Sequence, residues 1–172
     1  MPIYALGDQV PDIHPDAYIA PEAVLIGSVS VGAEASIWPG VVIRADDGPI
    51  VVGARTSIQD GAVLHTTAFT PTTVGDACVV GHLAHLEGCT IRDFALVGSQ
   101  SVVLHNAVVE SWALVGAGAL VPNNMVVPSG AMALGVPAKI KPDSASKELI
   151  ELSVTSYVER AKRFRAQLRR ID

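Results

Sequence analysis

Branched aliphatic side chains recur every six residues along most of this chain. The first run consists of Ile13, Ile19, Leu25, Val31, Ile37 and Ile43. After a break at residues 44–50, the ladder continues through Val52, Ile58, Leu64, Val74, Val80 and Leu86, with a second break at residues 65–73. After a slip of one residue, the longest run consists of Ile91, Val97, Val103, Val109, Val115, Val121 and Val127.

A period of six excludes an α-helix, because the apolar stripe would rotate around the helix surface. It fits a prism of short strands, in which three flat sides of about six residues close one coil of roughly 18. Small residues such as Ala62 and Ala84 follow the aliphatic position by four places, and glycine often follows it directly, as at Gly81 and Gly98. We expect the aliphatic side chain inside, the small one at the corner, and glycine to permit tight turns. The pattern covers about residues 12–140 and predicts a mainly β protein, a parallel β-helix.

The last part of the chain changes to the spacing of an α-helix. Apolar residues alternate at steps of four and three, through Ile150, Val154, Tyr157, Ala161, Phe164, Leu168 and Ile171. Pro142 precedes this stretch, and Asp143 or Ser144 is expected to cap the helix. We therefore expect a β-helix domain over 1–142 and, over 143–172, a C-terminal α-helix packed on the β-helix or on a neighbouring subunit.

Charge and composition narrow the classes of partner. The net charge is −5, divided into −7 over residues 1–142 and +2 over the tail. An acidic body disfavours nucleic acid and anionic lipid, and the basic tail residues are expected to form a solvated helix face. The sequence holds no uninterrupted apolar run long enough for a membrane span and no evident signal peptide. With Cys78 and Cys89 expected as buried thiols, we expect a cytoplasmic protein.

Polar residues capable of metal chemistry gather where the ladder is broken. His65 and Glu87 each follow an inward leucine directly, so we expect them at equivalent positions, stacked one coil apart. His85 should lie on the same outward face as Glu87, and His82 follows its inward residue by two places. Imidazole and carboxylate groups are a plausible ligand set for Zn²⁺ or Fe²⁺. Surface histidines hydrogen-bonded to their neighbours would explain the same residues.

Six short motifs add to this pattern: Arg44-Ala45-Asp46, Gln59-Asp60, Leu64-His65, Gly81-His82, Gly88-Cys89-Thr90-Ile91 and Leu134-Gly135-Val136-Pro137-Ala138-Lys139. They span nearly the whole chain and resemble those of the γ-class carbonic anhydrases and their bacterial relatives. The resemblance implies a left-handed β-helix that forms a homotrimer, with Zn²⁺ (or Fe²⁺ or Co²⁺) at the subunit interfaces. It further implies a lyase that hydrates CO2 reversibly to bicarbonate by means of a metal-bound hydroxide.

The resemblance also implies the metal ligands, with one departure. His65 and position 87 would come from one subunit, and His82 from its neighbour. The family has a histidine where this chain has Glu87, and a histidine lies two residues earlier, at His85. Either Glu87 ligates the metal, or His85 replaces the missing imidazole, or no metal is bound tightly.

Four further polar residues are implied to surround the site. Gln59 would orient the water or the CO2, whereas Arg44, Asp46 and Asp60 would form ion pairs or hydrogen bonds around it. The alternatives are an interface salt bridge for Arg44 and Asp46, and a polar cap on a coil for Gln59 and Asp60.

Two other functions compete with the hydratase. Many hexapeptide β-helices are acyltransferases that use one histidine as a base, for which His65, His82 or His105 could be nominated. Alternatively, the chain forms a non-catalytic trimeric scaffold or a small-ligand-binding protein, which the glutamate at position 87 would favour. His14 and His105 match no family ligand and are expected to be ordinary surface residues.

Overall fold

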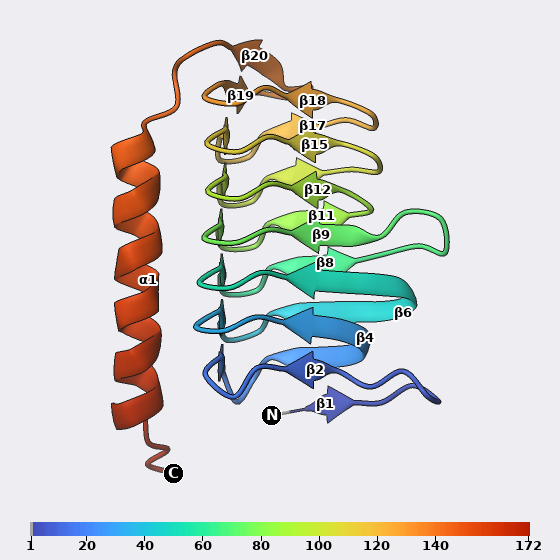
Figure 1. Ribbon diagram of the computed structural model, residues 1–172, viewed down its shortest axis with the longest axis vertical. Coiled ribbons are helices and arrows are strands. Elements are labelled where there is room, and N and C mark those ends of the chain that lie inside the picture. The colour runs from blue at the N-terminus through green and yellow to red at the C-terminus, as the bar shows by residue number, and fades with distance from the viewer. Residues whose placement is uncertain (1) are drawn as a thin grey trace.

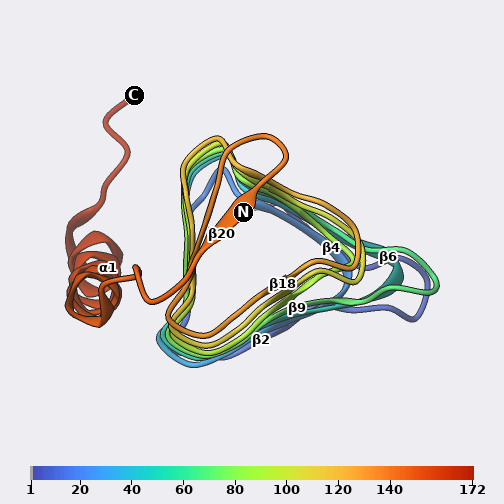
Figure 2. The same ribbon diagram turned by 90° about the horizontal axis from the view of Figure 1, so that it is seen from above.

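The structure, a computed structural model, describes residues 2–172. The chain winds into a left-handed parallel β-helix with three flat sides, and helix α1 (Lys147–Gln167) runs along one of them (Figures 1 and 2). The predicted fold class is therefore confirmed.

Each side of the prism is a stack of short strands. The side nearest α1 consists of β3 (Tyr18–Ile19), β5 (Ser36–Ile37), β7 (Ser57–Ile58), β10 (Val79–Val80), β13 (Leu96–Val97), β16 (Leu114–Val115), β19 (Met132–Leu134) and β20 (Lys139–Lys141). The second side consists of β1 (Ile3–Tyr4), β8 (Val63–His65), β11 (His85–Glu87), β14 (Val102–Val103), β17 (Leu120–Val121) and the first parts of two long strands, β4 (Val24–Val31) and β6 (Val42–Val52). The third side consists of β2 (Asp12–Ile13), β9 (Thr72–Val74), β12 (Thr90–Ile91), β15 (Val108–Val109), β18 (Val126–Val127) and the second parts of β4 and β6. Neighbouring strands are parallel, except that β20 folds back antiparallel on β19.

The six-residue ladder forms the core. Leu64, Leu86 and Val103 stack in register on successive coils, and each is fully buried. Ile43, in the same column one coil before Leu64, and Ile58, on another side of the prism, are also fully buried. Burying an aliphatic side chain of this size contributes about 1.5–3 kcal/mol to folding. Many such side chains, one on each side of each coil, therefore stabilise a core that contains few aromatic rings.

The glycines that follow the ladder residues serve a different purpose from the one expected. A Cβ atom at Gly81 would lie 2.6 Å from the backbone nitrogen of Ser99 on the next coil. This position therefore needs glycine because successive coils approach closely there. The left-handed backbone of the turn falls two residues later, on Leu83 with a φ of 59°.

Helix α1 packs on the β-helix of its own chain. Ile150, Val154, Val158 and Ala161 are its buried residues. Aromatic rings also pack between the helix and the coils. The ring centroid of Trp38, which follows β5, lies 5.1 Å from that of Phe164 in α1.

The ends of the helix differ from the sequence expectation. The N-cap is Ser146, whose Oγ accepts a hydrogen bond from the backbone N–H of Leu149 at 3.2 Å, rather than Asp143 or Ser144. The helix ends at Gln167, so the last residues of the apolar stripe lie beyond it, and Ile171 is 86% exposed.

Among residues 2–172, no helix is both long and apolar enough to cross a membrane.

Candidate functional site

His65 and Glu87 lie side by side at the ends of two neighbouring strands. β8 and β11 pair in parallel with Glu87 opposite His65, and β6 places Arg44 opposite His65 on the other side. His65 Nδ1 lies 3.0 Å from Glu87 Oε1. The prediction that these two side chains stack one coil apart is confirmed, because inward leucines in register force the following residues into one outward column.

A second carboxylate contacts the other ring nitrogen of His65. His65 Nε2 lies 3.3 Å from Asp46 Oδ1, and the other carboxylate oxygen of Asp46 forms an ion pair with Arg44. The imidazole is thus held between Asp46 and Glu87. All three of these side chains are mostly buried, with His65 18% exposed and each carboxylate 23% exposed.

Two more histidines contact Glu87. His85 Nε2 lies 3.1 Å from Glu87 Oε2, and His105 Nε2 lies 3.7 Å from Glu87 Oε1. The expectation that His85 shares the face of Glu87 is confirmed. His105 was expected to be an ordinary surface residue, but the coil above brings it to Glu87 over Gly88, where a Cβ atom would lie 2.7 Å from the His105 ring.

The contacts of both carboxylates shift their pKa values downward. The hydrogen bond with His65 lowers the pKa of Glu87, and His85 adds to it against the opposing effect of burial. Burial raises the pKa of Asp46, but a hydrogen bond with its own backbone and the contacts with Arg44 and His65 outweigh this effect and lower it. Both groups are therefore anionic at neutral pH, so negative charge flanks His65 on two sides.

His82 lies at the opposite edge of the same side of the prism. It occupies the corner before β11, where its Nδ1 lies 2.9 Å from Asp60 Oδ2, and both side chains are about half exposed. Glu87 follows His82 by five positions of partly extended chain, which corresponds to on the order of 15 Å. Gln59 is buried next to Asp60 at this corner. The predicted site residues thus form two groups within one chain. The first group contains His65 and Glu87, and the second contains His82, Asp60 and Gln59.

Strand β9, which follows the loop after His65, is tied to both β8 and β11. Thr72 is fully buried, and its hydroxyl donates to the carbonyl of His65 at 2.5 Å and accepts from the N–H of Gly88 at 2.7 Å. One hydroxyl therefore links the residue at the end of β8 to the residue that follows Glu87.

The side that carries both groups is lined with outward hydrophobic residues. Val42, Val63, His85, Val102 and Leu120 form one outward column in register, and the apolar ones are half-buried or exposed, up to 36% for Val63. Figure 2 shows that α1 covers a different side of the prism. This outward column of mostly apolar side chains is therefore available for contact with another protein surface.

The donor groups around His65 are of kinds that bind metal ions. Within residues 2–172, no three His, Cys, Asp or Glu side chains are arranged to hold a metal. His65 Nε2 and Asp46 Oδ1, 3.3 Å apart, are an imidazole and a carboxylate of the kind that bind Zn²⁺, Fe²⁺ or Co²⁺. A further donor from outside the chain would complete such a site.

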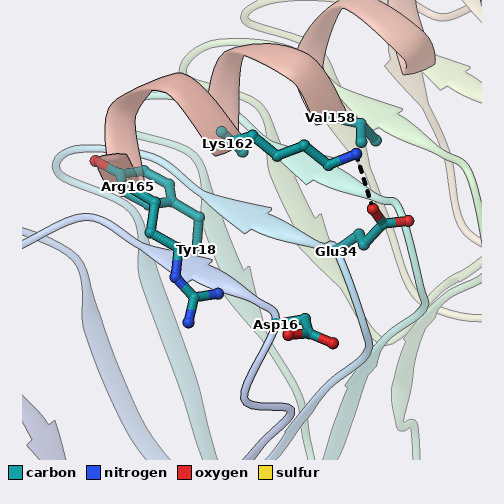
Figure 3. A pocket seen from close by; sticks show the side chains of 7 residues that line it. Asp16, Tyr18, Glu34, Val158, Lys162 and Arg165 are labelled. Carbon is teal, nitrogen blue, oxygen red and sulfur yellow. Dashed lines mark ion pairs between the residues drawn. The ribbon is translucent and has the colours of Figure 1, made fainter. Parts of the chain in front are cut away.

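A separate pocket of about 210 Å³ lies between α1 and the first coils (Figure 3). Lys162 Nζ and Glu34 Oε1 form an ion pair of 3.1 Å at its edge. Neither group of predicted site residues lines this pocket.

Comparison with known proteins places the chain among hexapeptide-repeat proteins. No protein-family model matches it. It is 40% identical over 166 residues to a carbonic anhydrase of Geobacillus kaustophilus, covering 95% of this chain and 91% of that one. It is 38% identical over 170 residues to the carnitine operon protein CaiE of Citrobacter koseri, covering 98% and 86%. It is also 40% identical over 152 residues to γ-carbonic anhydrase 2, mitochondrial, of Arabidopsis thaliana, covering 85% of this chain and 55% of that protein.

Solved structures agree with the fold. A Bacillus cereus protein described provisionally as an acetyltransferase superposes with a TM-score of 0.94 at 34% identity, covering 96% of this chain and 98% of that one. A hexapeptide transferase family protein of Anaplasma phagocytophilum superposes with a TM-score of 0.91 at 33% identity, covering 97% and 98%. The chain therefore belongs to the γ-carbonic anhydrase-like family of hexapeptide-repeat, left-handed β-helix proteins.

Proposed function

We propose that this protein is a metal-dependent hydratase of the γ-carbonic anhydrase type, which converts CO2 reversibly to bicarbonate. One observation carries the proposal: an imidazole, that of His65, is held between two anionic carboxylates at the edge of an apolar face. The similarity to carbonic anhydrases over nearly the full chain supports the same reaction.

The ligands would come from two copies of the chain. His65 and one carboxylate or His85 would come from one copy, and His82 from its neighbour. A single chain cannot combine His65 with His82, because they occupy opposite edges of one side of the prism. When bound, Zn²⁺, Fe²⁺ or Co²⁺ supplies Lewis-acid activation of water.

A homotrimer would bring these edges together. The outward column contains Val63, Val102 and Leu120 on both sides of His85. Covering it with a second copy would remove apolar surface from water. The same contact would place one copy's His82 corner beside another copy's His65 edge. The partner that we propose is therefore a second copy of the same chain.

The remaining residues would orient substrate and move protons. Gln59, buried at the His82 corner, would position the water or the CO2. The Arg44–Asp46 ion pair would hold the His65 side of the site, and Asp60 would hold His82 through Nδ1. Hydration of CO2 releases a proton, and His85, 36% exposed with Nε2 on Glu87, offers a route for it to solvent.

The experiment combines metal analysis with CO2 hydration. We expect purified protein to contain or to bind one of the three metals, and chelation to abolish hydration in a stopped-flow assay. His65→Ala should lower kcat/KM by at least about 100-fold, since it removes a ligand. His14→Ala, at an exposed histidine outside both groups, is the matched control. Protein that binds none of these metals, or full activity in His65→Ala, would contradict the proposal.

Acyl transfer is the second candidate, and the Bacillus cereus structure described provisionally as an acetyltransferase favours it. It predicts release of coenzyme A from acetyl-coenzyme A in the presence of an amine or alcohol, independent of metal. The absence of turnover over a panel of such acceptors would exclude it. If neither activity is found, the remaining alternative is a trimeric scaffold or small-ligand-binding protein.

We also propose a cytoplasmic location. Cys78 and Cys89 are buried free thiols, which accords with a reducing compartment.

A further inference from the structure

We infer that Asp46, rather than Glu87, supplies the carboxylate ligand of the metal, and that Glu87 is a positioning residue that fixes the ring of His65. This inference rests on the proposed metal site and specifies its donors. It starts from the two carboxylates of His65, because each ring nitrogen has its own: Nδ1 contacts Glu87 and Nε2 contacts Asp46.

A histidine that binds a metal uses one ring nitrogen for the ion and donates the other N–H to an acceptor, often a carboxylate. The contacts of the two carboxylates decide which nitrogen does which. Glu87 Oε1 already contacts His65 and His105, and Glu87 Oε2 contacts His85. Glu87 therefore suits an acceptor held by three imidazoles.

Asp46 is arranged differently. Its Oδ2 forms an ion pair with Arg44, whereas its Oδ1 lies on the side of His65. Asp46 Oδ1 and His65 Nε2 are 3.3 Å apart. Two donors at that separation are close enough together that both would hold one ion. The pair thus forms a two-donor edge, to which His82 of a neighbouring copy would add the third ligand.

This assignment gives the unusual glutamate a role. The site keeps two histidines and one carboxylate, but the carboxylate comes from β6 rather than β11. Glu87 would accept a hydrogen bond from Nδ1–H of His65, which leaves Nε2 as the ligand atom and fixes the plane of the ring. His85, on Glu87 Oε2, and His105, on Oε1, hold that carboxylate in place.

The test uses Co²⁺ as the probe, titrated into the full-length, chelator-treated protein. The visible absorption bands of bound Co²⁺ report the identity of its ligands, and the titration reports affinity. Four variants are compared with the original chain: Asp46→Asn, Glu87→Gln, Arg44→Gln and Asp47→Asn. Asp47 is the matched control, since it is an exposed carboxylate next to Asp46 in the same strand. Size-exclusion chromatography and thermal melting verify the assembly and folding of each variant.

We expect Asp46→Asn to change the absorption bands or to weaken Co²⁺ binding by more than about 100-fold. Glu87→Gln should weaken binding by about 10–100-fold with the bands unchanged, because the donors remain while their support is lost. Arg44→Gln should keep the bands, which separates a ligand role of Asp46 from its role in the ion pair. Asp47→Asn should resemble the original chain.

The opposite pattern overturns the inference. If Glu87→Gln changes the bands and Asp46→Asn does not, then Glu87 is the ligand, and the proposed metal-dependent function still stands. If the original chain binds neither Co²⁺, Zn²⁺ nor Fe²⁺, the proposed function and the inference both fail. If a variant does not fold, a Co²⁺-loaded crystal structure of the original chain replaces it as the test. In that structure, Asp46 Oδ1 should lie within about 2.2 Å of the ion.

Discussion

Replacing Thr72 with valine should destabilise the protein around the candidate site. Thr72→Val keeps the shape of the side chain and removes the hydroxyl that joins the His65 carbonyl to the Gly88 N–H. Each lost hydrogen bond is worth about 1 kcal/mol, and a buried N–H left without a partner costs about 1–3 kcal/mol. We therefore expect the free energy of unfolding to fall by about 2–4 kcal/mol. For a chain of this length that corresponds to a decrease in Tm of roughly 5–15 °C.

Thermal melting at one fixed protein concentration measures the effect, because an oligomer's Tm depends on concentration. Thr72→Ser keeps the hydroxyl and should recover most of the loss. Thr73→Val, at the half-buried neighbour in β9, should change stability by less than about 0.5 kcal/mol. If Thr72→Val melts within 2 °C of the original protein, about the smallest shift expected from 1 kcal/mol at this size, the linking role of the hydroxyl is refuted.

Three further predictions concern other parts of the molecule. Burial raises the pKa of Cys78 and of Cys89 to about 12, so a thiol reagent at pH 8 should modify them only after unfolding; rapid labelling of native protein would contradict this. Ile150→Ala should lower the free energy of unfolding by about 2–5 kcal/mol in urea titrations, because the side chain is fully buried against the β-helix, whereas Leu149→Ala at a half-exposed position should cost less than about 1 kcal/mol. The lowered pKa of Glu87 means that its contribution to stability is present above the ordinary value of 4.5 and is lost as the pH falls through the lowered value. Glu87→Gln should therefore reduce the dependence of Tm on pH below 4.5, and an unchanged dependence would contradict the assignment.

The inward residues of the β-helix were predictable because each flat side repeats one simple constraint. An aliphatic side chain every six residues places Leu64 and Leu86 in the same column of the core, and both are fully buried. That register also predicts His65 beside Glu87, since each follows one of these leucines. The coil-to-coil stacking thus allowed a spatial contact to be read from positions 22 residues apart.

Corners and interruptions were less predictable, because the repeat no longer sets the direction of the side chain there. The contact between Asp46 and His65 depends on where β6 runs past the end of its first side, which the spacing of hydrophobic residues does not specify. His105 lies at a corner, and its approach to Glu87 depends on the absence of a side chain at Gly88. The glycine was visible in the sequence, but its close neighbour was not.

The partners of helix α1 also needed the structure. The apolar stripe predicted a packed helix but left open whether it would cover its own β-helix or a neighbour's. Trp38 and Phe164 meet within one chain, which leaves the side with His65 and Val63 uncovered by α1. The side on which α1 packs thus determines which of the other sides can contact another copy of the chain.

Anomalous diffraction at the absorption edge of a bound metal tests the central claim most directly. Crystals of the protein loaded with Zn²⁺ or Co²⁺ should show a peak between two copies. It should lie within bonding distance of His65 from one copy and of His82 from the other. A metal held by one copy alone, or metal-loaded crystals with no peak at His65, would contradict the account.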